Sequence, residues 1–317
     1  MADRPKRQIR GNTERVGHVP APQLPRSTLL VAPPWHDYEL IDSGNGSKLE
    51  RFGPYTLVRP ETQAIWEPAL SEKEWNTADG VFQKGKSDEG AGSWQLRRSF
   101  PERWQMEHEG LQFWARLTPF RHTGVFPEHS AHWEWIRQQL LRYEQANVLV
   151  LFGYTGLYTL LAAQVGAKVC HVDASKPAIR WAQENQEVAR LQDKPVRWII
   201  EDVSKFLDRE RRRGSRYEMI IMDPPVFGRG PKGEIWRLTE GLPALLARCA
   251  ALLSDRPAGM LVNAYATSIS PITLFNLQHA VTRQWHGEVE VGELVLVDTA
   301  LARPLPAALY ARWTAGA

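Results

Sequence analysis

Residues 147–156 decide the fold of this chain, and they read Asn-Val-Leu-Val-Leu-Phe-Gly-Tyr-Thr-Gly. The continuous apolar run at 148–152, followed by a glycine-containing turn, predicts a strand that is buried on both faces. Gly153 and Gly156 let the backbone turn tightly and approach a ligand closely. The spacing is not the G-x-G-x-x-G pattern of dinucleotide-binding proteins. Taken alone, the turn is weak evidence for a ligand site, and an ordinary strand–helix connection is the alternative.

The segments around this stretch alternate between two kinds of pattern. Apolar runs predict strands over 168–172, 196–200, 219–222 and 260–263, and amphipathic segments predict helices over 135–143, 156–165, 176–190, 204–213 and 238–253. Such alternation predicts an α/β fold with a doubly wound, mostly parallel sheet that helices cover on both faces. Two more strand-like segments, 289–297 and 307–313, follow with little helix between them. We expect them to form a hairpin at one edge of the sheet.

The residues before this α/β region, which we place at 119–317, divide into two parts. Residues 1–34 are polar and proline-rich, and residues 1–26 carry six Arg or Lys against two acidic residues, so we expect a flexible basic leader. Such a leader is either a solvated tail or an arm that contacts a nucleic-acid backbone. Over 35–118, strand-length runs are separated by turn formers and carry many of the Trp residues. This pattern predicts a small β-rich domain.

Several classes of protein are disfavoured by composition and motif context. No stretch of the 317 residues approaches the roughly 18 apolar residues that span a bilayer, and the N-terminus lacks an apolar signal segment. We therefore expect a cytoplasmic protein with no membrane contact, and the only two cysteines, Cys170 and Cys249, fit buried reduced thiols. Residues 80–87 match the phosphate-binding P-loop pattern literally, but a buried strand does not precede them and Asp-Glu-Gly-Ala-Gly follows, so we reject that motif. We expect no metal, because a known ligand spacing is missing around His122, His129 and His132.

Acidic residues follow the second and third predicted strands. Ligands of open parallel sheets bind at the carboxyl ends of the strands, so these positions matter. Asp173, which precedes Ala174 and Ser175, is placed to accept hydrogen bonds from both ribose hydroxyls of a nucleoside. The alternative is a helix N-cap, for which Ser175 is the better candidate. Asp202 is placed to accept a hydrogen bond from an adenine amino group, while Val203 packs on the adenine ring. The alternative is that Asp202 caps a helix, and the two roles can coexist.

The fourth predicted strand ends in Asp223-Pro224-Pro225-Val226-Phe227, which is the strongest signal in the chain. Two prolines directly after a buried strand end the hydrogen-bond ladder and fix the backbone. Rigid carbonyl groups there can hold a nitrogen of a planar substrate, and Phe227 offers a face on which that substrate stacks.

In this order, the motifs F-G-Y-T-G (152–156), V-D-A-S (172–175), E-D-V (201–203) and D-P-P-V-F (223–227) resemble class I S-adenosylmethionine-dependent methyltransferases. More narrowly, they resemble the branch with large-subunit (23S) rRNA methyltransferases that modify cytosine C5 or guanine N7. The segment 122–128 also resembles that branch's H-T-G-x-F stretch, which closes over the cofactor as a lid. The resemblance covers roughly residues 115–317 and implies a Rossmann-like, seven-stranded sheet.

The resemblance implies a set of site residues. S-adenosylmethionine would contact the lid, which we place at 121–128, and the strand ends through His122, Thr123, Gly124, Phe126, Phe152, Gly153, Tyr154, Thr155, Gly156, Asp173, Ala174, Ser175, Asp202, Val203 and Asp223. The transfer itself would involve Asp223, Pro224, Pro225 and Phe227. Flanking phosphates of a nucleic acid would be held by Arg229, Lys232 and Arg237, which alternatively form a solvated loop.

The sequence departs from the cytosine-C5 enzymes in one respect. Those enzymes need a cysteine nucleophile, usually after the fifth strand, and residues 263–269 contain none. We therefore expect direct in-line transfer to a base nitrogen of RNA, with rRNA as the expected partner. The alternatives are a protein or small-molecule acceptor, or a non-catalytic cofactor-binding factor in ribosome assembly.

Overall fold

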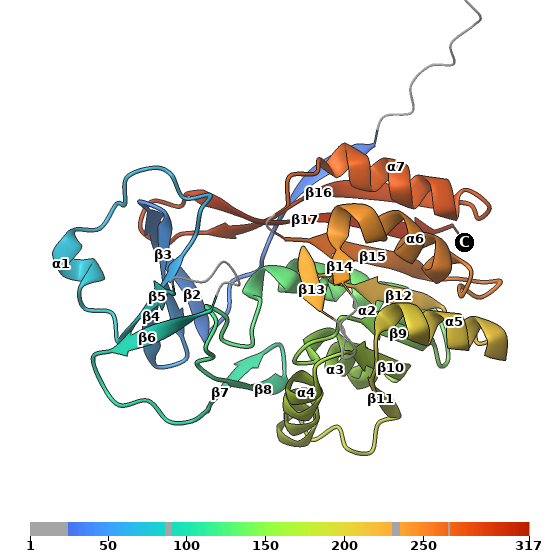
Figure 1. The fold of residues 1–317 in the computed structure, drawn as a ribbon, viewed down its shortest axis with the longest axis horizontal. Helices are drawn as coiled ribbons and strands as arrows, with labels where there is room; N and C mark the ends of the chain where they lie inside the picture. The colour runs from blue at the N-terminus through green and yellow to red at the C-terminus, as the bar shows by residue number, and fades with distance from the viewer. Residues whose placement is uncertain (1–24, 86–90, 230–234, 266, 317) are drawn as a thin grey trace, which may run out of the picture.

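The central feature of the computed structural model is an eight-stranded sheet in the order β1-β16-β17-β15-β12-β9-β10-β11 (Figure 1). The structure describes residues 25–85, 91–229, 235–265 and 267–316. Parallel pairing joins β9 (Asn147–Leu151), β10 (Lys168–Asp173), β11 (Val196–Ile200), β12 (Met219–Met222) and β15 (Gly259–Ala264). The hairpin of β16 (Gly287–Val297) and β17 (Pro304–Ala315) adds antiparallel strands. The predicted doubly wound sheet is confirmed in this arrangement.

Two expectations about the sheet are wrong because of β1 (Arg26–Val31). This strand pairs in parallel with β16, so the sheet has eight strands rather than seven, and the hairpin does not form its edge. Residues 26–31 are likewise strand rather than flexible leader; residues 1–24 lie outside the described residues. Gly292 in β16 allows the close approach, because a Cβ atom there would lie 1.8 Å from the carbonyl oxygen of Thr28.

Helices cover both faces of the sheet, as predicted. One face carries α2 (Trp133–Leu140), α3 (Leu157–Gln164) and α4 (Lys176–Val188), and the other carries α5 (Val203–Arg213), α6 (Leu238–Ala250) and α7 (Pro271–Thr282). Along β9, Val148 and Val150 join one hydrophobic core while Leu149 and Leu151 join the other. Both cysteines are buried free thiols in the second core. Helix α7 was not predicted, although Ser270 caps it and Pro271 opens it.

The β-rich region consists of a five-stranded sheet and a hairpin. The sheet contains β2 (Tyr38–Gly44), β3 (Ser47–Phe52), β4 (Tyr55–Pro60), β5 (Gly80–Lys84) and β6 (Gly92–Leu96), with the short helix α1 (Glu72–Trp75) between β4 and β5. The hairpin joins β7 (Trp104–His108) to β8 (Leu111–Ala115), and the 3-10 helix η1 (Pro127–His132) follows. The P-loop-like sequence enters β5 as an ordinary strand, and its last two residues lie outside the described ranges.

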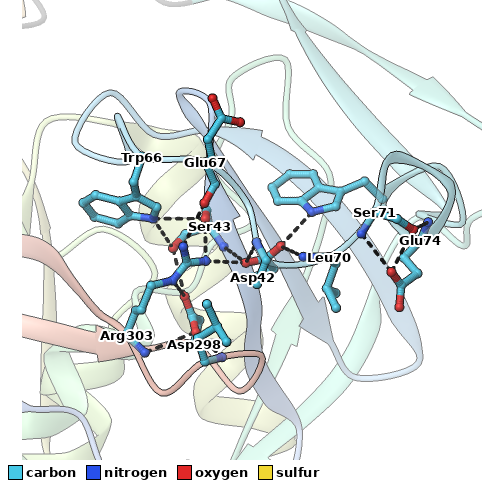
Figure 2. Close-up of polar contacts among 12 residues, drawn as sticks. Asp42, Ser43, Trp66, Glu67, Leu70, Ser71, Glu74, Asp298 and Arg303 are labelled. Carbon is cyan, nitrogen blue, oxygen red and sulfur yellow. Dashed lines mark hydrogen bonds and ion pairs between the residues drawn. The ribbon is translucent and has the colours of Figure 1, made fainter.

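The β-rich region and the α/β region share a continuous core, in which Trp35 and Phe113 cluster with Trp133 and Val150. The β16–β17 hairpin reaches across to the β-rich region, where Arg303 meets two buried carboxylates (Figures 1 and 2). Its guanidinium donates to Asp42 at 2.6 Å and to Asp298 at 2.9 Å. This ion cluster fixes the two regions against each other. Among the described residues, no helix is long and apolar enough to cross a membrane.

Candidate active site

The loop after β9 has an unusual backbone. Phe152 (φ 55°), Tyr154 (φ 47°) and Gly156 (φ 86°) all adopt left-handed conformations. A non-glycine residue held there costs on the order of 1–3 kcal/mol, and such strain concentrates at functional sites. Gly153 has no room for a side chain, because a Cβ atom would lie 2.3 Å from the ring of His171. Burial lowers the pKa of His171 to about 3, so the loop rests on a neutral ring.

Asp173, at the end of β10, holds this loop in place. Its carboxylate accepts hydrogen bonds from the backbone N–H groups of Tyr154 at 3.0 Å and Ser175 at 2.8 Å. Burial raises the pKa of Asp173, and these two hydrogen bonds oppose that rise. Each oxygen retains a second lone pair for a ligand hydroxyl. As predicted, Ser175 caps α4 by accepting from Ala178 N, and Ala174 lies between the two functional groups.

The lid segment 121–128 lies against the same loop. Thr155 Oγ1 donates to the Gly124 carbonyl oxygen at 2.7 Å, and the rings of Phe126 and Tyr154 lie 5.8 Å apart. Gly124 is required here, because a Cβ atom would lie 2.2 Å from the ring of Trp181. The structure therefore brings the lid and the loop together.

A pocket of about 490 Å³, open solvent included, lies at the carboxyl ends of the central strands, between the lid and the β9 loop. Its wall includes predicted residues of the loop and lid, together with Asp223 at the end of β12. It also includes residues that the sequence reasoning did not select, namely His129, Trp133, Leu157 and Tyr158. The histidine triplet at 122–132 was a signal for His129, but we considered it only as a possible metal site. The described residues contain no cluster of three or more His, Cys, Asp or Glu suited to a metal ion.

Asp223 presents its carboxylate to this pocket. Its Oδ2 lies 3.7 Å from Nε2 of His129. Burial raises the pKa of the Asp223 carboxyl. The nearby His129 opposes that rise electrostatically, and the negative charge of Glu128 adds to it. A carboxyl with a raised pKa beside a ligand pocket is suited to accepting a proton.

The Asp-Pro-Pro loop is fixed by contacts with the hairpin of β13 (Phe227–Arg229) and β14 (Ile235–Arg237). Trp236 Nε1 donates to the Pro225 carbonyl oxygen at 2.6 Å, and Leu238 N donates to that of Val226 at 2.9 Å. The buried Pro224 keeps its carbonyl oxygen free of hydrogen bonds from any described residue. Phe227 is 48% exposed.

The remaining predicted residues lie farther from the pocket wall. Asp202 caps α5 by accepting from Lys205 N at 3.0 Å, so the capping alternative is confirmed, and Val203 is buried in the core beside Phe206. Arg237 is exposed and lies 3.9 Å from Glu240. Arg229 ends β13, and Lys232 lies outside the described residues.

The cysteines do not offer a nucleophile. Burial raises the pKa of Cys170 to about 11 and also raises the pKa of Cys249, so both thiols stay protonated and unreactive. The loop after β15 carries Tyr265 instead, whose hydroxyl accepts from Arg121 Nη2 at 2.6 Å.

The pocket residues fit S-adenosylmethionine. Asp223 lines the pocket, and Asp173, which holds the β9 loop in the pocket wall, is an acceptor suited to ribose hydroxyls. In the lid, the buried Thr123 hydroxyl has no hydrogen-bond partner among the described residues, although it does not line the pocket. Burial also lowers the pKa of His122 to about 3, so this lid residue adds no charge beside a cationic cofactor.

Comparison with known proteins places the chain in a family. A sequence model of S-adenosylmethionine-dependent methyltransferases matches residues 67–282. The solved structure of a SAM-dependent methyltransferase from Agrobacterium tumefaciens is 43% identical, with a TM-score of 0.87 over 92% of this chain and 96% of that chain. Ribosomal RNA large subunit methyltransferase K/L of Hahella chejuensis is 29% identical over 207 residues, which are 65% of this chain and 26% of that protein. Ribosomal RNA large subunit methyltransferase I of Aeromonas salmonicida is 31% identical over 172 residues, which are 54% of this chain and 42% of that protein.

The chain therefore matches about a quarter of the length of the first of these two curated relatives and less than half of the second. The family model, in contrast, covers the β9 loop, the lid and the Asp-Pro-Pro loop, and the expected cofactor, S-adenosylmethionine, is confirmed. The chain belongs to the S-adenosylmethionine-dependent methyltransferase family.

Proposed function

We propose that this protein transfers a methyl group from S-adenosylmethionine to a base nitrogen of RNA, with large-subunit rRNA as the substrate. The observation that carries the proposal is the Asp223 carboxylate, which faces the cofactor pocket from a rigid Asp-Pro-Pro loop without a hydrogen bond from any described residue. The names of the two rRNA methyltransferase relatives support the choice of RNA. The missing cysteine supports nitrogen over carbon as the acceptor, within the cytosine-C5 and guanine-N7 branch.

The cofactor, when bound, supplies a methyl group activated by its sulfonium centre, so the protein contributes mainly proximity and alignment. Asp173 holds the ribose, and Asp202 at the start of α5 accepts from the adenine amino group. The lid, fixed by the Thr155–Gly124 hydrogen bond, excludes water from the pocket.

On the acceptor side, Asp223 accepts one hydrogen bond from an acceptor nitrogen that carries hydrogen and directs its lone pair at the methyl group, while the Pro224 carbonyl oxygen helps to orient the base. The nitrogen forms its new bond to carbon as the carbon–sulfur bond breaks, and the proton that the nitrogen loses goes to Asp223. Phe227 stacks the base once it has left its helix or loop. Arg229, Lys232 and Arg237 hold flanking phosphates.

The test is mass-spectrometric mapping of rRNA methylation in a strain that lacks the gene. We expect one methylated nucleotide to be missing, restored by the wild-type gene and not by Asp223→Asn. If every rRNA methylation persists, the acceptor is a protein or a small molecule. If Asp223→Asn restores the site in full, the transfer role of that carboxylate is refuted.

A further inference from the structure

A second cavity lies directly beside the cofactor pocket, on the side of β15. It measures about 310 Å³ with its open mouth included, and Phe126 of the lid lines both cavities. Its other walls come from three parts of the chain, namely β3 and β4 of the β-rich region, the lid, and the loop after β15; they include Lys48, Arg59, Arg121, His122, Glu128 and Tyr265. The enclosed part of this space is small, so a ligand reaches into it with one polar group rather than with a whole nucleotide.

The deepest charges of this cavity satisfy one another. Arg59 donates to both carboxylate oxygens of Glu50 at 2.7 Å, and its remaining nitrogen Nη1 donates to the Arg121 carbonyl oxygen at 3.1 Å. Lys48 Nζ lies 3.7 Å from Glu50 and 3.5 Å from Glu61. Two cations therefore face two carboxylates, and this set forms a neutral, rigid floor.

Glu128 is different, because it lines the cavity while accepting no hydrogen bond from any residue that the structure describes. It is only 4% exposed. Its carboxylate oxygens are open to the cavity, where water satisfies them or a ligand with its own donors replaces that water.

The position of Glu128 links it to the transfer site. It directly precedes His129, whose ring lies 3.7 Å from Asp223 and lines the cofactor pocket. The Arg121 guanidinium and the Tyr265 ring also line this cavity, and they stack on each other with 5.2 Å between Cζ and the ring centroid. A polar group that enters beside this stacked pair meets one carboxylate acceptor and one guanidinium donor.

We propose that this cavity is the acceptor pocket and that Glu128 accepts hydrogen bonds from the exocyclic amino group of a nucleobase. The inference rests on the proposed function, because it assumes a nucleobase acceptor. Guanine, adenine and cytosine carry such an amino group, whereas uracil offers a single ring N–H flanked by two carbonyl oxygens that Glu128 would repel. Glu128 thus selects amino-bearing bases.

The first test compares Glu128→Gln with Glu134→Gln, a matched control on the exposed face of α2 whose carboxylate accepts only from Gln138 within the described residues. The substrate is an unmodified large-subunit rRNA transcript, with tritiated S-adenosylmethionine as the methyl donor. We expect Glu128→Gln to lower kcat/KM for the transcript about 10- to 100-fold, the effect of losing a hydrogen bond to a charged group. The Kd for S-adenosylhomocysteine and the Tm should match those of the control. A kcat/KM equal to that of the control overturns the proposal.

The second test uses the wild-type protein saturated with S-adenosylhomocysteine, so it depends neither on a variant nor on methyl transfer. Calorimetric titrations compare GMP, AMP, CMP and UMP. At least one amino-bearing nucleotide should bind at least about tenfold more tightly than UMP, the lower value expected for a charge-assisted hydrogen bond. Equal binding of all four, or no binding, overturns the acceptor pocket. If an amino-bearing nucleotide binds selectively but the transcript is not methylated, the assignment of the pocket stands and the proposed rRNA substrate is wrong.

Discussion

Replacing Asp173 with alanine tests the cofactor site most directly. The carboxylate accepts two backbone hydrogen bonds, from Tyr154 at 3.0 Å and Ser175 at 2.8 Å, and it is proposed to accept from the ribose as well. A hydrogen bond to a charged group contributes about 1.5–3 kcal/mol, and each 1.4 kcal/mol changes a binding constant tenfold. Losing the ribose contact, together with the restraint on the left-handed Tyr154, should weaken S-adenosylmethionine binding about 100-fold.

Isothermal titration calorimetry with S-adenosylmethionine measures this effect, and thermal melting monitors the fold. Ser71→Ala is the control, because it removes the side-chain cap of the short helix α1 in the β-rich region and leaves the Asp173 carboxylate in place. The control should lose about 1 kcal/mol of stability and keep its affinity within about threefold. A folded Asp173→Ala variant that binds the cofactor as tightly as the control would refute the ribose assignment.

Three other predictions concern the acceptor side and the frame. Phe227→Ala should lower kcat/KM for an rRNA transcript about 10- to 100-fold through lost base stacking, with the Kd for the cofactor unchanged; a normal rate refutes the stacking role. Burial raises the pKa of Asp223, so the transfer rate should fall as the pH drops through a midpoint above the usual Asp value of about 3.9. If Asp223→Asn shows the same fall of the transfer rate at low pH, a group other than Asp223 causes that fall. Arg303→Ala leaves the buried Asp42 and Asp298 without their cation, and since both keep backbone N–H donors, urea titration should show a loss of about 3 kcal/mol. Arg248→Ala, which removes a half-exposed pair with Asp208, serves as its control and should lose less than about 1 kcal/mol; equal losses in the two variants would contradict the role of the Arg303 cluster.

The strands of the central sheet were predictable because their signal is local. The runs at 196–200 and 219–222 are short, apolar and bounded by polar or proline residues, and they match β11 and β12 residue for residue. Strand β1 carries only the short apolar run 29–31 inside a polar, proline-rich stretch, and its place depends on the far C-terminal strand β16 and on the space that Gly292 leaves. The Ser270-Pro271 pair that starts α7 was a readable helix signal that the sequence reasoning passed over.

The same distinction applies to the site. The β9 loop, Asp173 and Asp223 follow from a general rule, because ligands of parallel sheets bind where the strands end. Glu128 and His129 follow no strand; the 3-10 helix η1 carries them to the end of β12, and nothing in their sequence spacing indicates that contact. Lys48 and Arg59 come from β3 and β4 of a different sheet.

The β-rich region consequently does more than support the catalytic one. It contributes the buried Arg59–Glu50 pair that floors the second cavity, and Arg59 also donates to the backbone of Arg121, where the lid begins. The lid in turn binds the cofactor loop through Thr155, and the Arg303 cluster fixes the β-rich sheet to the β16–β17 hairpin (Figure 2). The Arg59 contact joins two walls of the second cavity, the Thr155 contact joins two walls of the cofactor pocket, and the lid is common to both. The boundary near residue 118 therefore divides two patterns of sequence, while the proposed acceptor pocket exists only because both parts pack into one core.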